Sequence, residues 1–271
     1  MCRVLEVGVS GYFAWRGRPD SHHTQEDKTL TEMIKTIHLK SRATYGSPRV
    51  QAELRAQGKQ VSRVRVTRLM KAAGLNVHCK RKFRTTTNSA HRHPIANTLL
   101  ARDFTAAKPN QKWATDITYL PTQEGWLYLA VIMDLFSRKV IGWAMRETLH
   151  TDLVLAALSM AQRHRQPAKG VLHHSDQGVQ YASGAYREAL TRLAAVQSMS
   201  RKGECWDNAV LESFFSTLKL ELNLEKAQGT RPQTRTLVFE WIEAFYNRER
   251  RHSSLGYLSP HAFEERWARL N

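Results

Sequence analysis

Three acidic residues, Asp116, Asp176 and Glu212, stand in stretches where their carboxylates could serve one reaction. Asp116 lies in the run 113–119, which is rich in β-branched and aromatic residues, and a carboxylate buried there without a partner or a metal would be costly. Asp176 follows a short apolar run, at the kind of strand end that often carries function. Glu212 stands in a stretch with the apolar spacing of a helix. The three carboxylates could therefore converge from separate elements.

Carboxylates arranged in this way suit metal-dependent chemistry on phosphodiesters. Magnesium and manganese prefer oxygen ligands and keep open positions for water and phosphate. Two such ions about 4 Å apart can activate an attacking oxygen and stabilise a leaving one. Lys219 follows Glu212 by seven residues, so a helix brings both to nearly the same face, where the lysine could contact DNA phosphate. His174 and Ser175, directly before Asp176, are candidates for orienting its loop.

The same residue types also have structural interpretations. A single aspartate on a strand often belongs to a cap, a bulge or an ion pair, and a glutamate on a helix is usually solvated. Asp134, Glu204 and Asp207 compete for the role of ligand, although Asp134 is expected to end a strand and Asp207 to cap a helix. His91 and His93 have no partner pair at a metal-binding spacing, so no zinc site is predicted there.

The elements that must position the carboxylates alternate strands with helices. Residues 113–120, which are rich in β-branched and aromatic residues, begin a predicted meander of three strands with a turn at Gly125, and helices follow it. The expected strands are 113–120, 126–133, 140–145, 171–174 and 196–199, and the expected helices are 152–163, 185–193 and one that begins after 208. This order predicts a mixed α/β sheet flanked by helices.

The first 75 residues predict a small helical region. Apolar spacing indicates a helix over 27–40, a second one capped by Ser47 with Pro48 at its first position, and a third capped by Ser62. Two helices joined by a tight glycine-containing turn are typical of a helix-turn-helix. Four basic residues of the last helix suit DNA contacts: Arg63, Arg65, Arg68 and Lys71. An ordinary helical hairpin with a solvated basic face explains the same pattern.

Charge distinguishes this region from the rest of the chain. The 271 residues carry a formal net charge of +17, and the pI is about 10.1. Residues 1–100 hold 19 of the 41 lysines and arginines but 6 of the 24 acidic residues, so they account for +13 of that charge. Such a distribution favours a nucleic-acid-binding module joined to another activity. A solvated basic surface or a ribosome-associated protein is the alternative.

Residues 76–106 are expected to form a basic linker. Lys80, Arg81 and Lys82 begin a run that could lie along a DNA backbone, and a plain connector is the alternative. No stretch has the character of a signal peptide or the length of an apolar bilayer span, so a soluble intracellular protein is expected. Three cysteines at unrelated spacings predict neither a disulfide framework nor a zinc site.

Motifs along most of the chain resemble those of one family. Thirty-five residues separate Asp176 from Glu212, which is the spacing of the D,D(35)E motif. The surrounding motifs match as well: TDITY at 115–119, HSDQG at 174–178, SMSRKG at 198–203, CWDNA at 205–209, ESFFSTLK at 212–219, FYN at 245–247, RHSSLGY at 251–257, SP at 259–260, GYFAW at 11–15 and YGS at 45–47. The chain thus resembles the DDE transposases of bacterial insertion sequences, and most closely the second-frame product of the insertion-sequence-three family.

The resemblance implies a fold and a reaction. The implied organisation is a helix-turn-helix region at 1–75, a linker at 76–106, an RNase H-like core similar to retroviral integrase at 107–225, and a helical extension at 226–271. The core would contain a mixed five-stranded sheet flanked by helices. Asp116, Asp176 and Glu212 would hold two Mg²⁺ or Mn²⁺ ions for cleavage of DNA 3′ ends and strand transfer. Transposition would follow a copy-out, paste-in route through a circular intermediate.

The resemblance also implies partners and a location. The partners would be the ends of the insertion element and target DNA, bound by a homo-oligomer in the cytoplasm at the nucleoid. Family members often work as frameshift fusions, so an upstream-frame product or a fusion with it is a further expected partner. Two other functions stay open from the sequence. One is a non-catalytic DNA-binding repressor derived from a transposase, and the other is an RNase H-type or junction nuclease that cleaves without joining.

Overall fold

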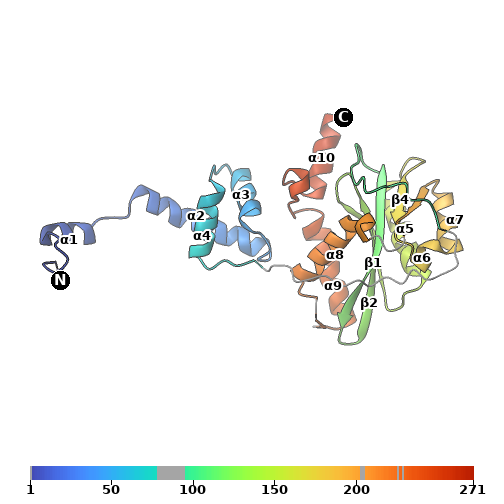
Figure 1. Ribbon diagram of the computed structural model, residues 1–271, viewed down its shortest axis with the longest axis horizontal. Coiled ribbons are helices and arrows are strands. Elements are labelled where there is room, and N and C mark those ends of the chain that lie inside the picture. Colours follow the sequence, from blue (N-terminus) through green and yellow to red (C-terminus); the bar gives the residue numbers. More distant parts are fainter. Residues whose placement is uncertain (1, 78–94, 202–204, 225, 228) are drawn as a thin grey trace. The chain divides into compact units, whose positions relative to one another are not determined.

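The computed structural model describes residues 2–77, 95–201, 205–224, 226–227 and 229–271. The chain divides into two compact units, Met1–His78 and Cys79–Asn271, and Figure 1 labels most of their helices and strands. The residues considered in the sequence that lie outside the described part are Cys79, Lys80, Arg81, Lys82, His91, His93, Lys202, Gly203 and Glu204. Across the described residues, no helix combines the length and the apolar character that crossing a membrane requires.

The described residues of the first unit form four helices, α1 (Val9–Arg16), α2 (His22–Lys40), α3 (Ser47–Ala56) and α4 (Arg63–Ala72). The apolar stripes of α2, α3 and α4 meet in a small core, and its most deeply buried members are Ile34, Val50, Leu54 and Val66. The helix-turn-helix pair predicted from the sequence is therefore formed by α3 and α4.

Of the two helix caps predicted from the sequence in the first unit, the structure confirms one and contradicts the other. Ser62 caps α4 as expected, because its side chain accepts a hydrogen bond from the backbone N–H of Arg65 at 3.2 Å. The prediction for Ser47 is wrong. The cap of α3 is Gly46, Ser47 is the first helical residue, and no side chain caps this end. Pro48 lies in the first turn, where its missing N–H is not needed.

The second unit is built on a five-stranded sheet with the order β3-β2-β1-β4-β5. Its strands are β1 (Lys112–Thr122), β2 (Gly125–Asp134), β3 (Val140–Arg146), β4 (Leu172–Ser175) and β5 (Val196–Met199). The first three strands pair antiparallel, whereas β4 pairs parallel to β1 and β5 parallel to β4. The mixed sheet expected from the sequence is thus confirmed, and β1 is its central strand.

Helices cover both faces of this sheet (Figure 1). On one face lie α5 (Thr151–Arg165), α6 (Val179–Ala182) and α7 (Gly184–Arg192). On the other lie α8 (Ala209–Glu221), α9 (Arg231–Glu240) with the π-helical turn Trp241–Tyr246, and α10 (Pro260–Leu270). Short 3₁₀ turns at Cys205–Asn208 and Ser253–Leu255 complete the unit. The sequence did not predict α6, whose four residues are too few for a helical period.

Alternation along β1 divides its side chains between the two layers. Trp113 belongs to the core cluster with the side chains of α5, α6 and α7, and the hydroxyl of Thr115 lies 3.3 Å from that of Tyr181. The intervening residues, Asp116 among them, therefore face the layer that contains α8. On the first side α5 packs so closely on β3 that a Cβ at Gly142 would lie 2.3 Å from the carbonyl oxygen of Ala157.

The described end of the expected linker, residues 95–106, packs beside β5. The backbone N–H groups of Leu99 and Leu100 both donate to the Ser198 hydroxyl, at 2.9 and 3.3 Å. The Thr98 hydroxyl donates to the carbonyl of Met199 at 2.6 Å, and Leu100 is buried. This segment is therefore a packed part of the second unit.

Candidate active site

Asp116 and Asp176 stand at the same level of two neighbouring strands. The parallel pairing of β1 with β4 joins Ala114 to His174. Two residues further along each chain are Asp116, in the middle of β1, and Asp176, directly after β4. One Asp116 carboxylate oxygen accepts a hydrogen bond from the backbone N–H of Ile117 at 2.7 Å. The sheet thus brings the first two predicted ligands side by side.

The charges around Asp116 identify its neighbours. Burial raises the pKa of the Asp116 carboxyl well above its ordinary range, and the negative charge of Asp176 raises it further. The hydrogen bond from Ile117 and the charge of Lys219 act in the opposite direction, whereas Glu212 adds to the increase. The four charged groups predicted from the sequence therefore share one electrostatic site.

The turn after β4 is shaped by the carboxylate of Asp176. Its Oδ1 atom accepts a hydrogen bond from the backbone N–H of Gly178 at 2.9 Å. A Cβ at Gly178 would lie 2.9 Å from that same oxygen, so a side chain there would displace the carboxylate. The Ser175 hydroxyl donates to the backbone carbonyl of Asp176 at 2.9 Å. Ser175 thus contacts the Asp176 backbone and not its carboxylate.

His174 holds elements together and does not point its ring at the carboxylates. Its Nδ1 atom lies 2.9 Å from the hydroxyl of Ser198, and its Nε2 atom lies 3.1 Å from the carbonyl of Asp207. Burial lowers the pKa of His174 to about 4, so the ring is neutral at physiological pH. It joins β4 to β5 and to the segment that begins α8.

Glu212 and Lys219 both lie on α8. Burial raises the pKa of Glu212, which stands in the first turn. Lys219 is in the last turn, where burial lowers its pKa and the charge of Asp116 raises it. Both side chains are partly buried. The two predicted residues of this helix thus lie on the side directed at the sheet.

Asp207 and Asn208 fix the start of α8. The carboxylate of Asp207 accepts hydrogen bonds from Arg102 at 2.8 Å and from the backbone and guanidinium of Arg201 at 3.0 to 3.1 Å. These bonds hold the pKa of Asp207 well below its usual range. The expectation that Asp207 caps the helix is wrong, because Asn208 is the cap residue and no side chain caps this end. The side-chain amide of Asn208 donates to the carbonyl of Thr115 at 3.3 Å.

Asp134 lies away from the carboxylate pair. It ends β2, as expected, and accepts hydrogen bonds from the backbone of Phe136 at 3.0 Å and of Asn110 at 2.8 Å. Arg165 lies 3.7 Å from its carboxylate. Burial raises the pKa of Asp134 even so. Its bonds to the backbone explain its presence without a metal.

Carboxylates are chemically suited to bind a hard divalent cation. Glu212, however, does not form a close group of three ligands with Asp116 and Asp176. Carboxylate oxygens are the donors that magnesium and manganese prefer. The mutual repulsion that raises the pKa of Asp116 is what a bound cation would relieve. Among the described residues, no three His, Cys, Asp or Glu side chains lie close enough together to hold one ion. Of the predicted ligands, Asp116 and Asp176 are the two that neighbouring strands bring side by side.

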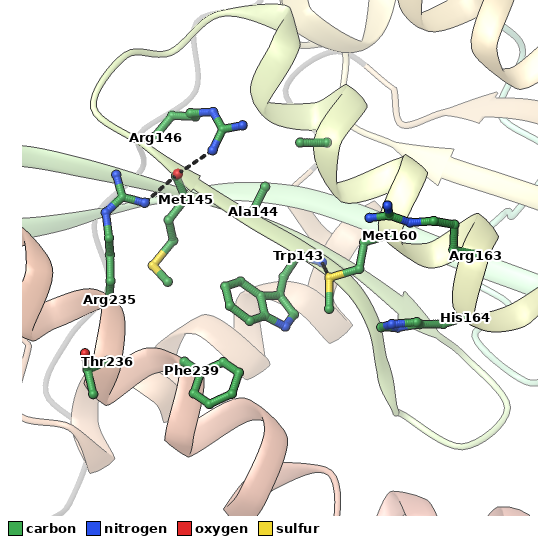
Figure 2. Close-up of a pocket in the computed structure, with 11 residues that line it drawn as sticks. Trp143, Ala144, Met145, Arg146, Met160, Arg163, His164, Arg235, Thr236 and Phe239 are labelled. Atoms are coloured by element: carbon green, nitrogen blue, oxygen red, sulfur yellow. Dashed lines mark hydrogen bonds between the residues drawn. The ribbon is translucent and has the colours of Figure 1, made fainter.

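A hollow of about 620 Å³ lies elsewhere, at the outer edge of β3 between α5 and α9 (Figure 2). Trp143, Met145, Arg163 and Phe239 are among its lining residues, and the predicted catalytic residues are not. Figure 2 shows Arg146 and Arg235 both directed at the carbonyl of Met145, at 3.2 and 2.7 Å. These bonds satisfy a carbonyl of β3, which is an edge strand of the sheet that the described residues form.

Both units of the chain are similar to known protein domains. Residues 106–205 and 194–260 each match an integrase core domain, and residues 24–83 match an HTH-like domain. A 31 kDa protein of insertion element IS600 from Shigella sonnei is 44% identical over 270 residues, which cover 100% of this chain and 99% of that protein. Transposase InsF of insertion sequence IS3A from Escherichia coli K12 is 43% identical over 268 residues, covering 98% and 93%.

The chain belongs to the IS3 family of insertion-sequence transposases. A solved structure, a simian T-cell lymphotropic virus intasome in complex with PP2A regulatory subunit B56 gamma, contains a chain that matches 85% of this transposase. The match covers 74% of that chain, with 17% identity and a TM-score of 0.50. At this identity the likeness concerns the fold alone. The integrase-like sheet and the HTH-like domain expected from the sequence are both confirmed.

The basic residues of the transposase's α4 are not equally available to DNA. Arg65 donates to Asp27 at 2.8 Å and to Glu26 at 3.0 Å, and Arg68 donates to Asp27 at 2.5 Å. These two arginines therefore bind the acidic side of α2. Arg63 and Lys71 are exposed and make no such ion pair with the described residues, and Arg68 is also exposed, with 54% of its side chain accessible beside Asp27. Helical periodicity explains why Arg65 faces α2, but its acidic partners on α2 could not be predicted from the sequence.

Proposed function

We propose that this transposase cleaves and joins DNA strands at the carboxylates Asp116, Asp176 and Glu212. In the first step, water attacks a phosphodiester at the end of the element, the bond to the 3′ oxygen breaks, and a 3′-OH is released. In the second step, that 3′-OH attacks a phosphodiester of the target. A new P–O bond forms as another breaks, so the transfer needs no external energy source.

One observation carries this proposal. Asp116, on the central strand, has a pKa raised by Asp176 and Glu212 and lowered by Lys219, which indicates converging acidic groups with one cation beside them. Such convergence is typical of functional sites. The high identity to a transposase of IS3A supports the same reaction.

The residues have separate roles in this proposal. Asp116 and Asp176 would hold Mg²⁺ or Mn²⁺ ions with Glu212, and two bound ions supply the Lewis acid that activates the attacking oxygen and stabilises the leaving one. Lys219 would bind the phosphate next to the reacting bond. Arg63 and Lys71, together with any release of Arg65 and Arg68 from α2, would bind DNA through the helix-turn-helix. The basic run at Lys80, Arg81 and Lys82 would add phosphate contacts.

The proposal extends to organisation and partners. We assign residues 1–75 to DNA recognition, 76–106 to a basic connection whose last part, 95–106, packs on the second unit, 107–225 to catalysis and 226–271 to a helical extension. The ends of the element and target DNA are the proposed partners, bound by a homo-oligomer at the nucleoid. An upstream-frame product or a frameshift fusion with it is a further proposed partner.

The test is incubation of the full chain with duplexes that carry the ends of the element encoding it. Nicking and joining are scored separately with Mg²⁺, with Mn²⁺ and with a chelator. The proposal expects both products with either metal and neither with the chelator. Binding without products would favour a repressor, and cleavage without joining would favour a nuclease. Joining in the chelator would contradict the metal-dependent mechanism.

A further inference from the structure

The last residue of α8 is bound by the chain that follows α9. Arg250 donates to the carboxylate of Glu221 through Nη2, at 2.8 Å from Oε1, and through Nε, at 3.0 and 3.2 Å from the two oxygens. Each of these side chains is only 6% exposed. The indole N–H of Trp241 donates to Oε2 of the same carboxylate at 3.1 Å. Glu221 is thus held by two residues of the C-terminal extension.

The same segment contacts α8 two helical turns earlier. The ring of Phe214 lies 5.6 Å from that of Trp241 and 4.8 Å from that of Tyr246, between centroids. Phe214 and Glu221 are seven residues apart, so they lie on nearly the same side of the helix. We call Trp241, Tyr246 and Arg250 the α8 clamp, because together they hold this side of α8 at two levels.

The clamped side of α8 is opposite the side that carries the proposed site residues. Glu212 and Lys219 are also seven residues apart, and each stands two positions before a clamped residue, Phe214 or Glu221. Residues two positions apart on an α-helix point about 200° away from each other. Rotation of α8 that moved the clamped side would therefore also turn Glu212 and Lys219 away from the sheet.

The clamp is itself attached to the sheet. The side chain of Asn247 accepts a hydrogen bond from the backbone N–H of Val140 and donates to its carbonyl, both at 2.9 Å. The Tyr246 hydroxyl donates to the carbonyl of Arg138 at 3.0 Å, directly before β3. This strand belongs to the sheet whose central strand carries Asp116. The clamp therefore sets the orientation of α8 relative to the strand of the first proposed ligand.

We infer that Glu221 and its partners Trp241 and Arg250 are positioning residues for strand transfer, which set the rotation of α8 and so the approach of Glu212 to the carboxylates on the sheet. A buried ion pair contributes little net stability relative to apolar residues of similar volume, so its contribution here is the fixed geometry. The inference rests on the proposed function, because the rotation of α8 matters to the reaction only if Glu212 is a ligand. It gives part of the helical extension a role in catalysis.

The test replaces the ion pair without leaving one charge buried alone. Glu221→Met combined with Arg250→Met should fold with a Tm close to that of wild type, since apolar side chains substitute well for buried ion pairs. Hydrogen–deuterium exchange in chelator should be faster in peptides from α8. Strand transfer of pre-cut ends should fall more than about tenfold and need more Mg²⁺, because small displacements of reacting groups are costly. Arg250→Lys keeps the charge without the planar contact, so both effects should be smaller.

Arg165→Met combined with Glu264→Met is the matched control. It removes another ion pair of the C-terminal extension, with side chains 13% exposed, which joins α10 to α5 and not to α8. Exchange in α8 and the Mg²⁺ requirement should stay at the wild-type values.

Two results would overturn the α8 clamp. One is wild-type exchange and Mg²⁺ requirement in the folded Glu221→Met, Arg250→Met protein, and the other is an equal change in the control. Arg250→Lys provides the same comparison if the double variant does not fold. Faster exchange in α8 of the double variant, with no strand transfer by wild type, would instead contradict only the proposed function.

Discussion

Asn208 donates a hydrogen bond from its side-chain amide to the backbone carbonyl of Thr115, at 3.3 Å. Both residues are buried. Thr115 directly precedes Asp116, and Asn208 directly precedes α8, the helix that carries Glu212. The bond therefore ties together the two elements on which the first and third proposed ligands stand.

Asn208→Ala should impair catalysis more than folding. Loss of one buried hydrogen bond should lower the free energy of unfolding by about 1–3 kcal/mol. Strand transfer should fall by more than about tenfold and need more magnesium, because small displacements of reacting groups are costly. Gln197→Ala is the control, since it removes a similar amide-to-carbonyl bond, to Tyr181 at 3.1 Å, away from α8. Equal magnesium dependence in the two variants would contradict a positioning role for Asn208.

The sequence predicted the position of Asp116 because its surroundings are local. The β-branched and aromatic residues of 113–119 identify a strand, and an acidic residue among them stands out even when the fold is unknown. The partners of Asp207 could not be found in this way. Arg102 is 105 residues away, and only the sheet brings it to the start of α8. Helix-start statistics favoured a cap at Asp207, whereas two arginines supply a stronger interaction.

The same limit applies to the first unit. Helical spacing predicted which side of α4 is buried, and Val66, Leu69 and Met70 are indeed buried. Spacing could not reveal that Asp27 lies beside Arg65 and Arg68, because those contacts span 38 and 41 residues. It also treated Ser47 as a cap, although a helix can begin at Gly46 without a side-chain cap.

Asp116→Asn should stabilise the metal-free protein while abolishing strand transfer. Burial and repulsion by Asp176 raise the pKa of Asp116, so its ionised form opposes folding at neutral pH. The amide keeps the shape and can still accept the hydrogen bond from Ile117. Thermal unfolding in chelator should give a higher Tm for the variant, and added Mg²⁺ should raise the Tm of wild type only. A lower Tm in chelator would contradict the proposed electrostatic strain.

The ion pairs of Asp207 should make stability depend on acid pH. Its ordinary pKa is 3.8, and Arg201 and Arg102 lower it in the folded protein. Their contribution is therefore complete above about pH 4 and is lost as the pH falls below that value towards the folded pKa. Asp207→Asn should lower the free energy of unfolding by about 1–3 kcal/mol at neutral pH. The difference from wild type should shrink in urea titrations at lower pH. A constant difference would mean that charge is not what Asp207 contributes.

Lys219 should affect joining through its charge. Lys219→Ala should weaken binding of pre-cut element ends and reduce strand transfer, while Mg²⁺ still raises the Tm. Lys219→Arg keeps the charge but changes the shape, so an intermediate rate is expected. Lys169→Ala removes an exposed lysine from the same unit and controls for net charge. Wild-type rates for Lys219→Ala, measured at matched salt, would remove Lys219 from the site.

The exposed side of α4 should determine sequence preference, and the side facing α2 should determine stability. Arg63, Val64 and Thr67 are exposed near the start of the helix, where recognition helices contact base edges. Arg65 is instead bound to Asp27 and Glu26. Arg63→Ala should therefore reduce the preference for the element end over a scrambled duplex by about 1–3 kcal/mol. Arg65→Ala should lower the Tm of the first unit and leave that preference unchanged.

The affinities for the element end and for the scrambled duplex are both measured with the full chain, in chelator and at one salt concentration. The salt concentration is fixed because phosphate contacts alone make binding salt-dependent. Lys71→Ala provides a comparison for such contacts. A phosphate contact at Lys71 should weaken both duplexes alike and reduce the slope of log K against log salt by about 0.9. Loss of the preference in Arg65→Ala, with Arg63→Ala unaffected, would place base recognition on the side of α4 that faces α2. The ion pairs to Asp27 would then have to open whenever the transposase binds its DNA.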